Sequence, residues 1–568
     1  MKKCSRTLDY SLSIKKMHLL FEEQDYPIEV IQTLGLREFY RQTSPTTARF
    51  NYIGFHKNYE TDKSVFTLPK IFLHDGKVFG KYDFIDFANM QARQVLSPKE
   101  YDILRGLVEK LYFCLRQYQK ETGSDSIEST FGYSIKSNIG TSDIGSFEAM
   151  LALIAFNRSN PYLFVQQKEV VLSKKPKHTN WKKTLSTSLP IDYNGLPLYL
   201  DLVGGAKRDK RDDPLLIVYY SLLNEFRQYD PTITIDPSVE ILPPGKLLRS
   251  KTKIALFLRT SKASYFSDKF KQLHSLLYAY YFANKANYKN QRIEFLFTDD
   301  FDRVFEKIVD RLLSDEYLLS QYKYLKDGKE IDHLFGESDV FKGNKIICIG
   351  DSKYYKDPRR LSSQRYKQFT YARNIIQENI YVLNSGNETI YSRNYRDSIS
   401  EGYNVTPNFF ILGTVKPNYL EAGFLIEPDD LTPEFSFHFP NRLFDRDTLH
   451  VLYFNADFIR LLNFYVGKQK RLSFGRQMLR DGARETIQRQ FSSYLDGKYE
   501  FYELRISAQF VEDNFRSLHG KLFTSPALFP KYIMALERVF SDENNSILGF
   551  LRNSGVEFSP AQLPVFNI

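Results

Sequence analysis

The sequence predicts a mixed α/β protein built from several domains. The chain has 568 residues, whereas one domain holds roughly 100–200. Residues 49–80 contain short runs of β-forming residues broken by polar turns, which predicts strands. Residues 98–122 instead repeat apolar side chains at helical spacing, which predicts an amphipathic helix. Strands and helices that alternate in this way are typical of an α/β fold.

Further segments divide the chain. Residues 123–146 are rich in Gly and Ser, which favours a loop at the first domain boundary. Residues 212–229 open with Asp-Asp-Pro, a helix start signal, and residues 269–288 also predict a helix. We expect four parts: a β-rich and helical N-terminal domain at 1–125, a central helical and β domain with basic loops at 126–289, an α/β domain that carries the motifs below at 290–465, and a mainly helical extension at 466–568.

Charge and cysteine content narrow the class of protein. The formal net charge of +10 favours a polyanionic partner, because basic surface attracts phosphate and releases its counterions. A mildly basic protein with no special partner is the alternative. Cys4, Cys114 and Cys348 are too few and too far apart to predict a disulfide framework or a zinc cluster. With no apolar run that would serve as a signal peptide or membrane span, we expect a cytoplasmic protein without membrane contact.

Residues 297–356 form the most informative stretch. An apolar stripe predicts a helix at 297–319, with Glu306 next to the stripe. A short strand, a turn at 341–344 and a strongly apolar strand follow, which indicates a hairpin. Side chains alternate along a strand, so Asp351 and Lys353 share one face. Asp332 lies across the turn, and the pairing brings it close to Asp351.

Two neighbouring carboxylates favour a divalent cation. At contact distance they repel each other by on the order of 4 kcal/mol at an effective dielectric constant of about 20, and a cation removes that repulsion. Oxygen ligands select magnesium or manganese rather than zinc. Such a metal polarises a phosphoryl oxygen and acidifies a bound water. Lys353 then orients or deprotonates the water and stabilises charge in the transition state.

This pattern resembles the PD-(D/E)xK nuclease superfamily. Asp332 corresponds to the Asp of the first strand, and Asp351 with Lys353 to the D/E-x-K of the second. The Pro that usually precedes the first Asp is absent, because Glu330 and Ile331 stand there. The resemblance implies a Mg²⁺-dependent endonuclease and adds three candidate site residues: Glu306 on the preceding helix, as a further metal ligand, and Gln364 and Gln368 on the following helix at 359–376.

A narrower resemblance covers about residues 50–465. The Lys-Tyr-Tyr after the second strand and YKQFTYA on the next helix resemble LlaJI-type restriction endonucleases and McrC subunits. Gly54, Pro69 and Lys70 fit a "vGvi…vlPKi" pattern of these proteins. Asn180, Trp181 and Thr184 fit part of a "G-x-I-N-W-x-x-T" box, whose Gly and Ile are absent here.

The resemblance implies the cutting subunit of a restriction system that works with a McrB-like AAA+ NTPase. The chain has no phosphate-binding G-x-x-x-x-G-K-[S/T] loop: residues 243–250, PPGKLLRS, lack the first Gly and the Ser or Thr after Lys. Any nucleotide-driven step therefore belongs to a partner. A methyltransferase in the same system is a further expected partner. Cutting both strands usually needs two such sites, which makes a homodimer an open alternative.

Two groups of residues are candidates for contact with nucleic acid. Arg359, Arg360 and Lys367 follow the second strand and suit phosphate binding by position. Trp181, the single Trp, is flanked by Lys182 and Lys183, and either stacks on a base or anchors a core beneath a basic loop. The core anchor is the favoured interpretation of Trp181.

Three functions remain in competition. The leading hypothesis is an endonuclease that acts on double-stranded DNA. The second is a DNA-binding adaptor that recruits the NTPase without cutting. The third is a defence nuclease that uses the same site on RNA or single strands.

Overall fold

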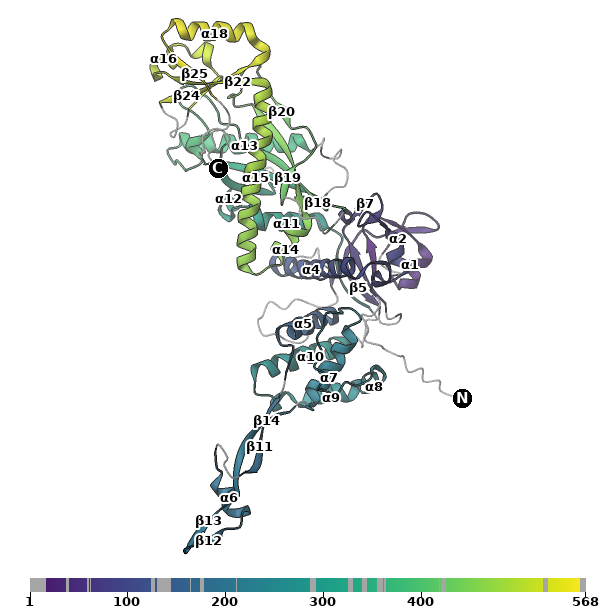
Figure 1. Cartoon of the computed structure of the whole chain (residues 1–568). Coiled ribbons are helices and arrows are strands. Elements are labelled where there is room, and N and C mark those ends of the chain that lie inside the picture. Colours follow the sequence, from purple (N-terminus) through teal and green to yellow (C-terminus); the bar gives the residue numbers. More distant parts are fainter. Residues whose placement is uncertain are drawn as a thin grey trace.

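The structure, a computed structural model, shows an elongated molecule (Figure 1). A narrow arm projects from one end, and the C-terminal elements lie at the other. The structure describes residues 17–36, 40–58, 61, 63–123, 128–129, 145–163, 165–173, 178–210, 212–286, 293–324, 330–339, 345–354, 361, 364–417, 419, 425–524 and 530–561.

A five-stranded sheet of order β1-β6-β5-β15-β10 forms the N-terminal part. The predicted helix is confirmed as α4 (Pro98–Thr122), which packs on the sheet. Ser97 and Glu100 cap its start reciprocally, which satisfies two backbone N–H groups. The strands are β1 (Met17–Phe21), β5 (Ile53–Asn58), β6 (Lys63–Leu68), β10 (Glu128–Ser129) and β15 (Ile293–Thr298).

Strand β15 follows the expected boundary at residue 290 and nevertheless pairs with β5. The chain thus returns to the N-terminal sheet before it enters the next one, while the four-part division itself stays a prediction. Gly54 lies where the two strands meet, with φ of 147°. A Cβ there would come within 2.1 Å of the Leu296 carbonyl oxygen. This close approach explains why Gly occupies the position.

Smaller elements surround this sheet. They are β2 (Asp25–Pro27), α1 (Ile28–Leu34), β3 (Arg41–Gln42), β4 (Thr47–Arg49), the 3₁₀ turn η1 (Lys70–Phe72), β7 (Leu73–His74), β8 (Lys77–Val78), β9 (Tyr82–Asp83), α2 (Phe84–Asn89) and α3 (Ala92–Val95). The strands pair as β2-β4-β3 and β7-β8-β9.

The middle part is a group of helices that carries the arm (Figure 1). Both predicted helices are confirmed as α7 and α10, and Asp213 caps α7 by accepting a hydrogen bond from the Leu215 N–H at 2.9 Å. Antiparallel β11 and β14 form the arm, with α6 and the β12-β13 hairpin at its tip. The elements are α5 (Ser146–Ser159), β11 (Val165–Ser173), α6 (Trp181–Thr187), β12 (Ile191–Tyr193), β13 (Leu196–Leu198), β14 (Leu202–Lys210), α7 (Pro214–Phe226), α8 (Pro244–Arg249), α9 (Lys251–Thr260), η2 (Lys262–Ser264) and α10 (Asp268–Ala286).

The third part is a mixed sheet of order β16-β17-β18-β21-β19, with β20 also paired to β21. The predicted hairpin is confirmed, since β16 and β17 are antiparallel. Helix α13 connects β17 to β18, which run parallel. The elements are β16 (His333–Ser338), β17 (Lys345–Lys353), α13 (Arg365–Asn384), η5 (Ser392–Asn394), β18 (Asn408–Thr414), β19 (Ile426–Pro428), β20 (Glu434–Ser436), β21 (Leu449–Asp457) and α14 (Phe458–Tyr465).

The single helix expected at 297–319 is instead two helices, α11 (Phe301–Leu313) and α12 (Glu316–Tyr322). Asp315 lies between them and accepts a hydrogen bond from the Gly336 N–H at 2.9 Å. Its other oxygen lies 2.6 Å from Arg480 and 3.1 Å from Arg476, both on α15 (Gln469–Lys498). These tertiary contacts keep α11 and α12 as two separate helices. The helical spacing of apolar residues does not reveal such contacts.

Helices account for most of the described C-terminal extension, and a small sheet lies among them. After α15, a four-stranded sheet of order β23-β24-β22-β25 forms, with α18 beside it (Figure 1). The sequence did not predict this sheet, because its strands are short and separated by helices. The elements are β22 (Tyr499–Arg505), α16 (Ala508–Asp513), α17 (Phe515–Leu518), β23 (Leu522–Phe523), β24 (Lys531–Glu537), η6 (Arg538–Phe540), α18 (Ser541–Asn553) and β25 (Glu557–Ala561). Among the described helices, none has the length and apolar character needed to cross a membrane.

Candidate active site

The end of the β16-β17 hairpin brings the three predicted residues together. His333 pairs with Gly350, and continuing this antiparallel register by one residue places Asp332 opposite Asp351. The Lys353 ammonium lies 3.6 Å from Oδ2 of Asp332 and forms an ion pair with Oδ1 of Asp351. The hairpin thus places two carboxylates around one ammonium group.

Burial strengthens the electrostatic interactions among Asp332, Asp351 and Lys353. The side chain of Asp351 is 1% exposed, and those of Asp332 and Lys353 are 10% exposed. Four buried apolar residues lead into the charged end of β17, so the strand is fixed by the core before it reaches the site: Ile346, Ile347, Cys348 and Ile349. The prediction that Cys348 is a small core residue is confirmed by its complete burial.

Gln368 on α13 completes the contacts of Asp351. Its Nε2 donates a hydrogen bond to Oδ2 of Asp351 at 2.8 Å. Its backbone carbonyl accepts a hydrogen bond from Nδ2 of Asn408 at 2.9 Å, which ties this turn of α13 to β18. Gln364, the other candidate, is the half-buried residue that precedes α13. The structure therefore brings Gln368 to Asp351, and Asn408 is a supporting residue that sequence reasoning missed.

Two carboxyl groups near Lys353, those of Asp332 and Glu306, have raised pKa values. Burial raises the pKa of Asp332 to about 7, with repulsion from Asp351 adding to the effect and Lys353 opposing it. Burial likewise raises the pKa of half-buried Glu306 to about 7, against the attraction of Lys353 and together with repulsion from Asp351. Glu306 thus lies in the electrostatic field of the group. Burial disfavours the charged form of Lys353, but Asp351 and Asp332 outweigh this and raise its pKa above the ordinary value.

A cleft of about 850 Å³ opens onto Asp332 and Glu306. It lies between the C-terminal end of α4, helix α11 and the start of α13. Sequence reasoning missed the contribution of α4, because that helix is about two hundred positions away in the chain. The lining residues are Tyr118, Thr122, Asp300, Asp302, Arg303, Glu306, Lys307, Asp310, Lys323, Tyr324, Glu330, Asp332, Lys367 and Tyr371.

One of the predicted phosphate-binding residues lies in the wall of this cleft. The Lys367 ammonium is 5.3 Å from the centroid of the Tyr371 ring. Burial lowers the pKa of Lys367, but Tyr371 and the nearby Asp351 carboxylate outweigh this effect. The pKa therefore lies above its ordinary value, and the group stays charged. Arg359 and Arg360 lie outside the described residues.

Trp181 does not anchor a core. Its side chain is 57% exposed at the start of α6, so the favoured interpretation was wrong. Asn180 caps α6 by accepting a hydrogen bond from the Lys183 N–H at 3.2 Å, and the buried Thr184 hydroxyl accepts one from the Val203 N–H at 2.9 Å. Asn180 and Thr184 thus fix α6 to the arm, while Trp181, Lys182 and Lys183 are exposed to solvent.

The carboxylate pair suits a divalent cation. Oδ2 of Asp332 and Oδ1 of Asp351 are buried, and the Lys353 ammonium is the charge that compensates both. Across the described residues, no three or more His, Cys, Asp or Glu side chains are arranged as a ready metal site. Magnesium usually takes only one or two protein carboxylates and fills its other positions with water and phosphate. Asp332 and Asp351 fit that mode.

Comparison with known proteins adds little. No protein-family model and no curated protein matches the chain. A refined half-complex of Thermococcus gammatolerans McrB AAA+ hexamers with bound McrC is similar to it with a TM-score of 0.28 and 11% identity, over 82% of this chain and 99% of that one. The cryo-EM structure of the Thermococcus gammatolerans McrBC complex gives a TM-score of 0.18 and 12% identity, over 52% and 85%. Likeness at these values does not establish a shared fold.

Proposed function

We propose that this chain is a Mg²⁺-dependent endonuclease that hydrolyses DNA phosphodiester bonds as the cutting subunit of a restriction system. The observation that carries the proposal is the contact of Lys353 with both Asp332 and Asp351 at a buried strand end beside a cleft. A buried charge cluster is costly to keep, and a structural hairpin would gain nothing from placing three charges there. Such clusters in clefts are typical of catalytic sites.

Each residue has a distinct role in this proposal. Asp332 and Asp351 hold the cation, which when bound polarises the phosphoryl group and acidifies a water molecule. The Gln368 amide holds one oxygen of Asp351 and leaves the other directed at the site. Lys353 is charged between its two carboxylates, so it stabilises negative charge on the phosphate rather than taking up a proton. Glu306 and Lys367 act from the cleft wall, Lys367 by binding phosphate.

Metal removal tests the proposal directly. We expect the purified chain, supplied with its NTPase partner, to cut duplex DNA with Mg²⁺ or Mn²⁺ and to stop when EDTA is added, because without the cation nothing polarises the phosphoryl group or acidifies the attacking water. The measurement is gel analysis of duplex DNA, single-stranded DNA and RNA in parallel. Cutting confined to RNA or single strands would show that these, and not duplex DNA, are the substrate. Salt-sensitive DNA binding without any cutting would leave the adaptor function.

The raised pKa values predict that Mg²⁺ affinity falls as the pH drops below about 7. Asp332 and Glu306 are then protonated, and the cation must displace those protons. Calorimetric titration at pH 6 and pH 8, in two buffers of different ionisation enthalpy, measures both affinity and proton release. Asp332→Asn should abolish the share of the proton release that comes from Asp332. Equal affinity at both pH values would contradict the prediction.

The same shifts affect stability with the opposite pH trend. In the unfolded chain these carboxyl groups have pKa values near 4, so the metal-free folded state holds more protons between about pH 4 and 7. This site therefore stabilises the metal-free folded protein at low pH, and that stabilisation is lost as the pH rises through about 7. Bound Mg²⁺ should restore that loss at pH 8.

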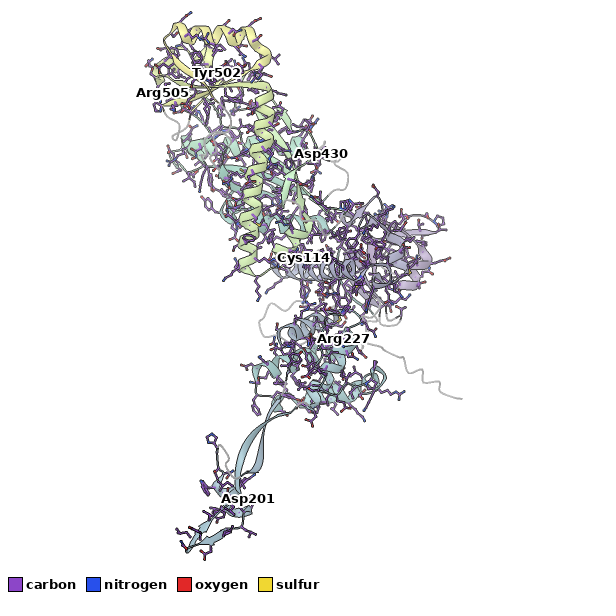
Figure 2. All side chains as sticks on the ribbon, viewed as in Figure 1. Cys114, Asp201, Arg227, Asp430, Tyr502 and Arg505 are labelled. Carbon is purple, nitrogen blue, oxygen red and sulfur yellow. The ribbon has the colours of Figure 1, made fainter. Side chains whose placement is uncertain are left out.

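We also propose that the arm tip, residues 178–201, binds the AAA+ NTPase partner. Leu189, Leu196 and Tyr193 are 90%, 70% and 65% exposed, and Asp201 shows that this segment lies at the arm's far end (Figure 2). Monomeric proteins rarely expose so many large apolar groups together, and such surfaces usually bind other proteins. The further exposed apolar residues of the tip are Trp181, Leu185, Ile191, Leu198 and Leu200.

A further inference from the structure

The residue that follows β17 leaves the candidate active site and enters the N-terminal part of the molecule. Tyr354 is 1% exposed, and its ring lies 5.2 Å from that of Phe301 and 6.3 Å from that of Phe305 on α11. Its hydroxyl donates a hydrogen bond to Oε2 of Glu22 at 2.7 Å and accepts one from the Lys70 N–H at 3.0 Å. Tyr354 thus links β17, α11 and the N-terminal part.

The N-terminal partners of this tyrosine are themselves buried and charged. Glu22 follows β1, and its Oε2 also accepts a hydrogen bond from the Lys70 N–H at 3.3 Å. The Lys70 ammonium lies 2.7 Å from Oε1 of Glu23 and 4.9 Å from the centroid of the Tyr354 ring. Burial raises the pKa of Glu22 to about 7, while Lys70 and the Tyr354 hydroxyl oppose the shift. A polar cluster of this kind is costly to bury unless its partners stay in place.

Two sequence motifs without an assigned role meet in this cluster. Pro69-Lys70 comes from the N-terminal sheet, and Tyr354 is the first tyrosine of the Lys-Tyr-Tyr motif. Lys353, the first residue of that motif, is the ammonium that contacts both carboxylates of the active site. The same ring supports α11, which carries Glu306. A shift of the N-terminal part would therefore move both Lys353 and the helix that carries Glu306.

We propose that Glu22, Lys70 and Tyr354 form a positioning joint, through which the N-terminal part holds Lys353 in place for cleavage. This inference rests on the proposed nuclease function. The three residues touch neither the carboxylates nor the cleft and act through Lys353. Misplacing a catalytic group by about 1 Å can cost on the order of 100-fold in rate, so a joint one residue away from the ammonium has strong leverage on the rate.

A second tyrosine provides a matched control. Tyr419 is also buried, and its hydroxyl donates a hydrogen bond to the Phe72 backbone carbonyl of the N-terminal part. Its ring packs on Phe72 and Phe79, with centroids 5.6 Å and 4.2 Å away. Tyr419 thus crosses the same boundary through a single hydroxyl but is not adjacent to an active-site residue. Generic loosening of the boundary would affect both tyrosines alike.

The test compares Tyr354→Phe with Tyr419→Phe in the full chain. We expect Tyr354→Phe to lower kcat about 10- to 100-fold, with KM for DNA and thermal stability near those of the parent, and Tyr419→Phe to keep kcat. Glu22→Gln, which retains an acceptor oxygen, should keep more activity than Glu22→Ala. A parental kcat in Tyr354→Phe, or equal losses in both tyrosine variants, would overturn the joint.

Amide hydrogen exchange separates this inference from the proposed function. Tyr354→Phe should speed exchange of the amides at 351–354, whereas Tyr419→Phe should leave them unchanged. This comparison requires no cleavage. A parent chain that never cuts DNA therefore refutes the nuclease function, and the exchange result still decides the joint. Unchanged exchange at 351–354 in Tyr354→Phe refutes the joint even in an active nuclease.

Discussion

Replacing Asp351 with Asn should abolish Mg²⁺-dependent cleavage of DNA and leave the protein folded. Asn keeps the size of the side chain but removes the charge that holds the cation and pairs with Lys353.

Lys353→Met should lower kcat by roughly 10²–10³ or more, because an ammonium aimed at developing charge contributes that much in a dry site. The measurements are single-turnover cleavage, DNA binding and thermal unfolding. DNA affinity should change little, since these groups act mainly in the transition state.

The control for this experiment lies on the same hairpin. Glu337 stands near the other end of β16, where it lies 3.8 Å from Arg484 of α15. Glu337→Gln removes one carboxylate from the hairpin without touching the site and should keep the parental kcat. Mg²⁺-dependent cutting by purified Asp351→Asn at the parental rate would refute the assignment. An equal loss in Glu337→Gln would instead mean that the hairpin as a whole had been disturbed.

Local sequence predicted the geometry of the hairpin because strand pairing is a short-range property. Asp332 and Lys353 are close in the chain, and the alternation of side chains along β17 sets which of them share a face. The apolar spacing of α4 and the Asp-Asp-Pro start of α7 are also local, which is why both helices were predicted. Features of this kind depend on a few neighbouring residues.

Long-range features escaped prediction for the opposite reason. The pairing of β15 with β5 joins segments that are far apart in the chain, and no local pattern marks it. Gln364 and Gln368 have similar local environments in sequence, and only the docking of α13 on β17 turns Gln368 toward Asp351. The core-anchor interpretation of Trp181 was wrong because the docking of α6 on the arm turns Thr184, and not Trp181, toward β14.

Charge at the arm tip should separate partner binding from cutting. Leu189→Asp with Leu196→Asp places two carboxylates in the exposed apolar surface, and we expect NTPase binding to weaken by at least about 30-fold, since a few apolar anchors usually dominate an interface. Stability should stay near the parental value, because exposed side chains leave no cavity when replaced. Binding of the purified NTPase is measured by biolayer interferometry, and its nucleotide hydrolysis is measured alongside.

Phe266 offers the matched control, since it is an apolar residue 85% exposed but outside the arm. Phe266→Asp should leave partner binding intact. Partner binding that survives the double change at the tip would refute the tip as the docking surface. A loss of DNA binding instead, with a steep dependence on salt and a similar loss in Trp181→Ala, would assign the tip to nucleic acid. Within residues 178–201, eight exposed large apolar side chains stand beside only two lysines, Lys182 and Lys183, which favours the protein partner.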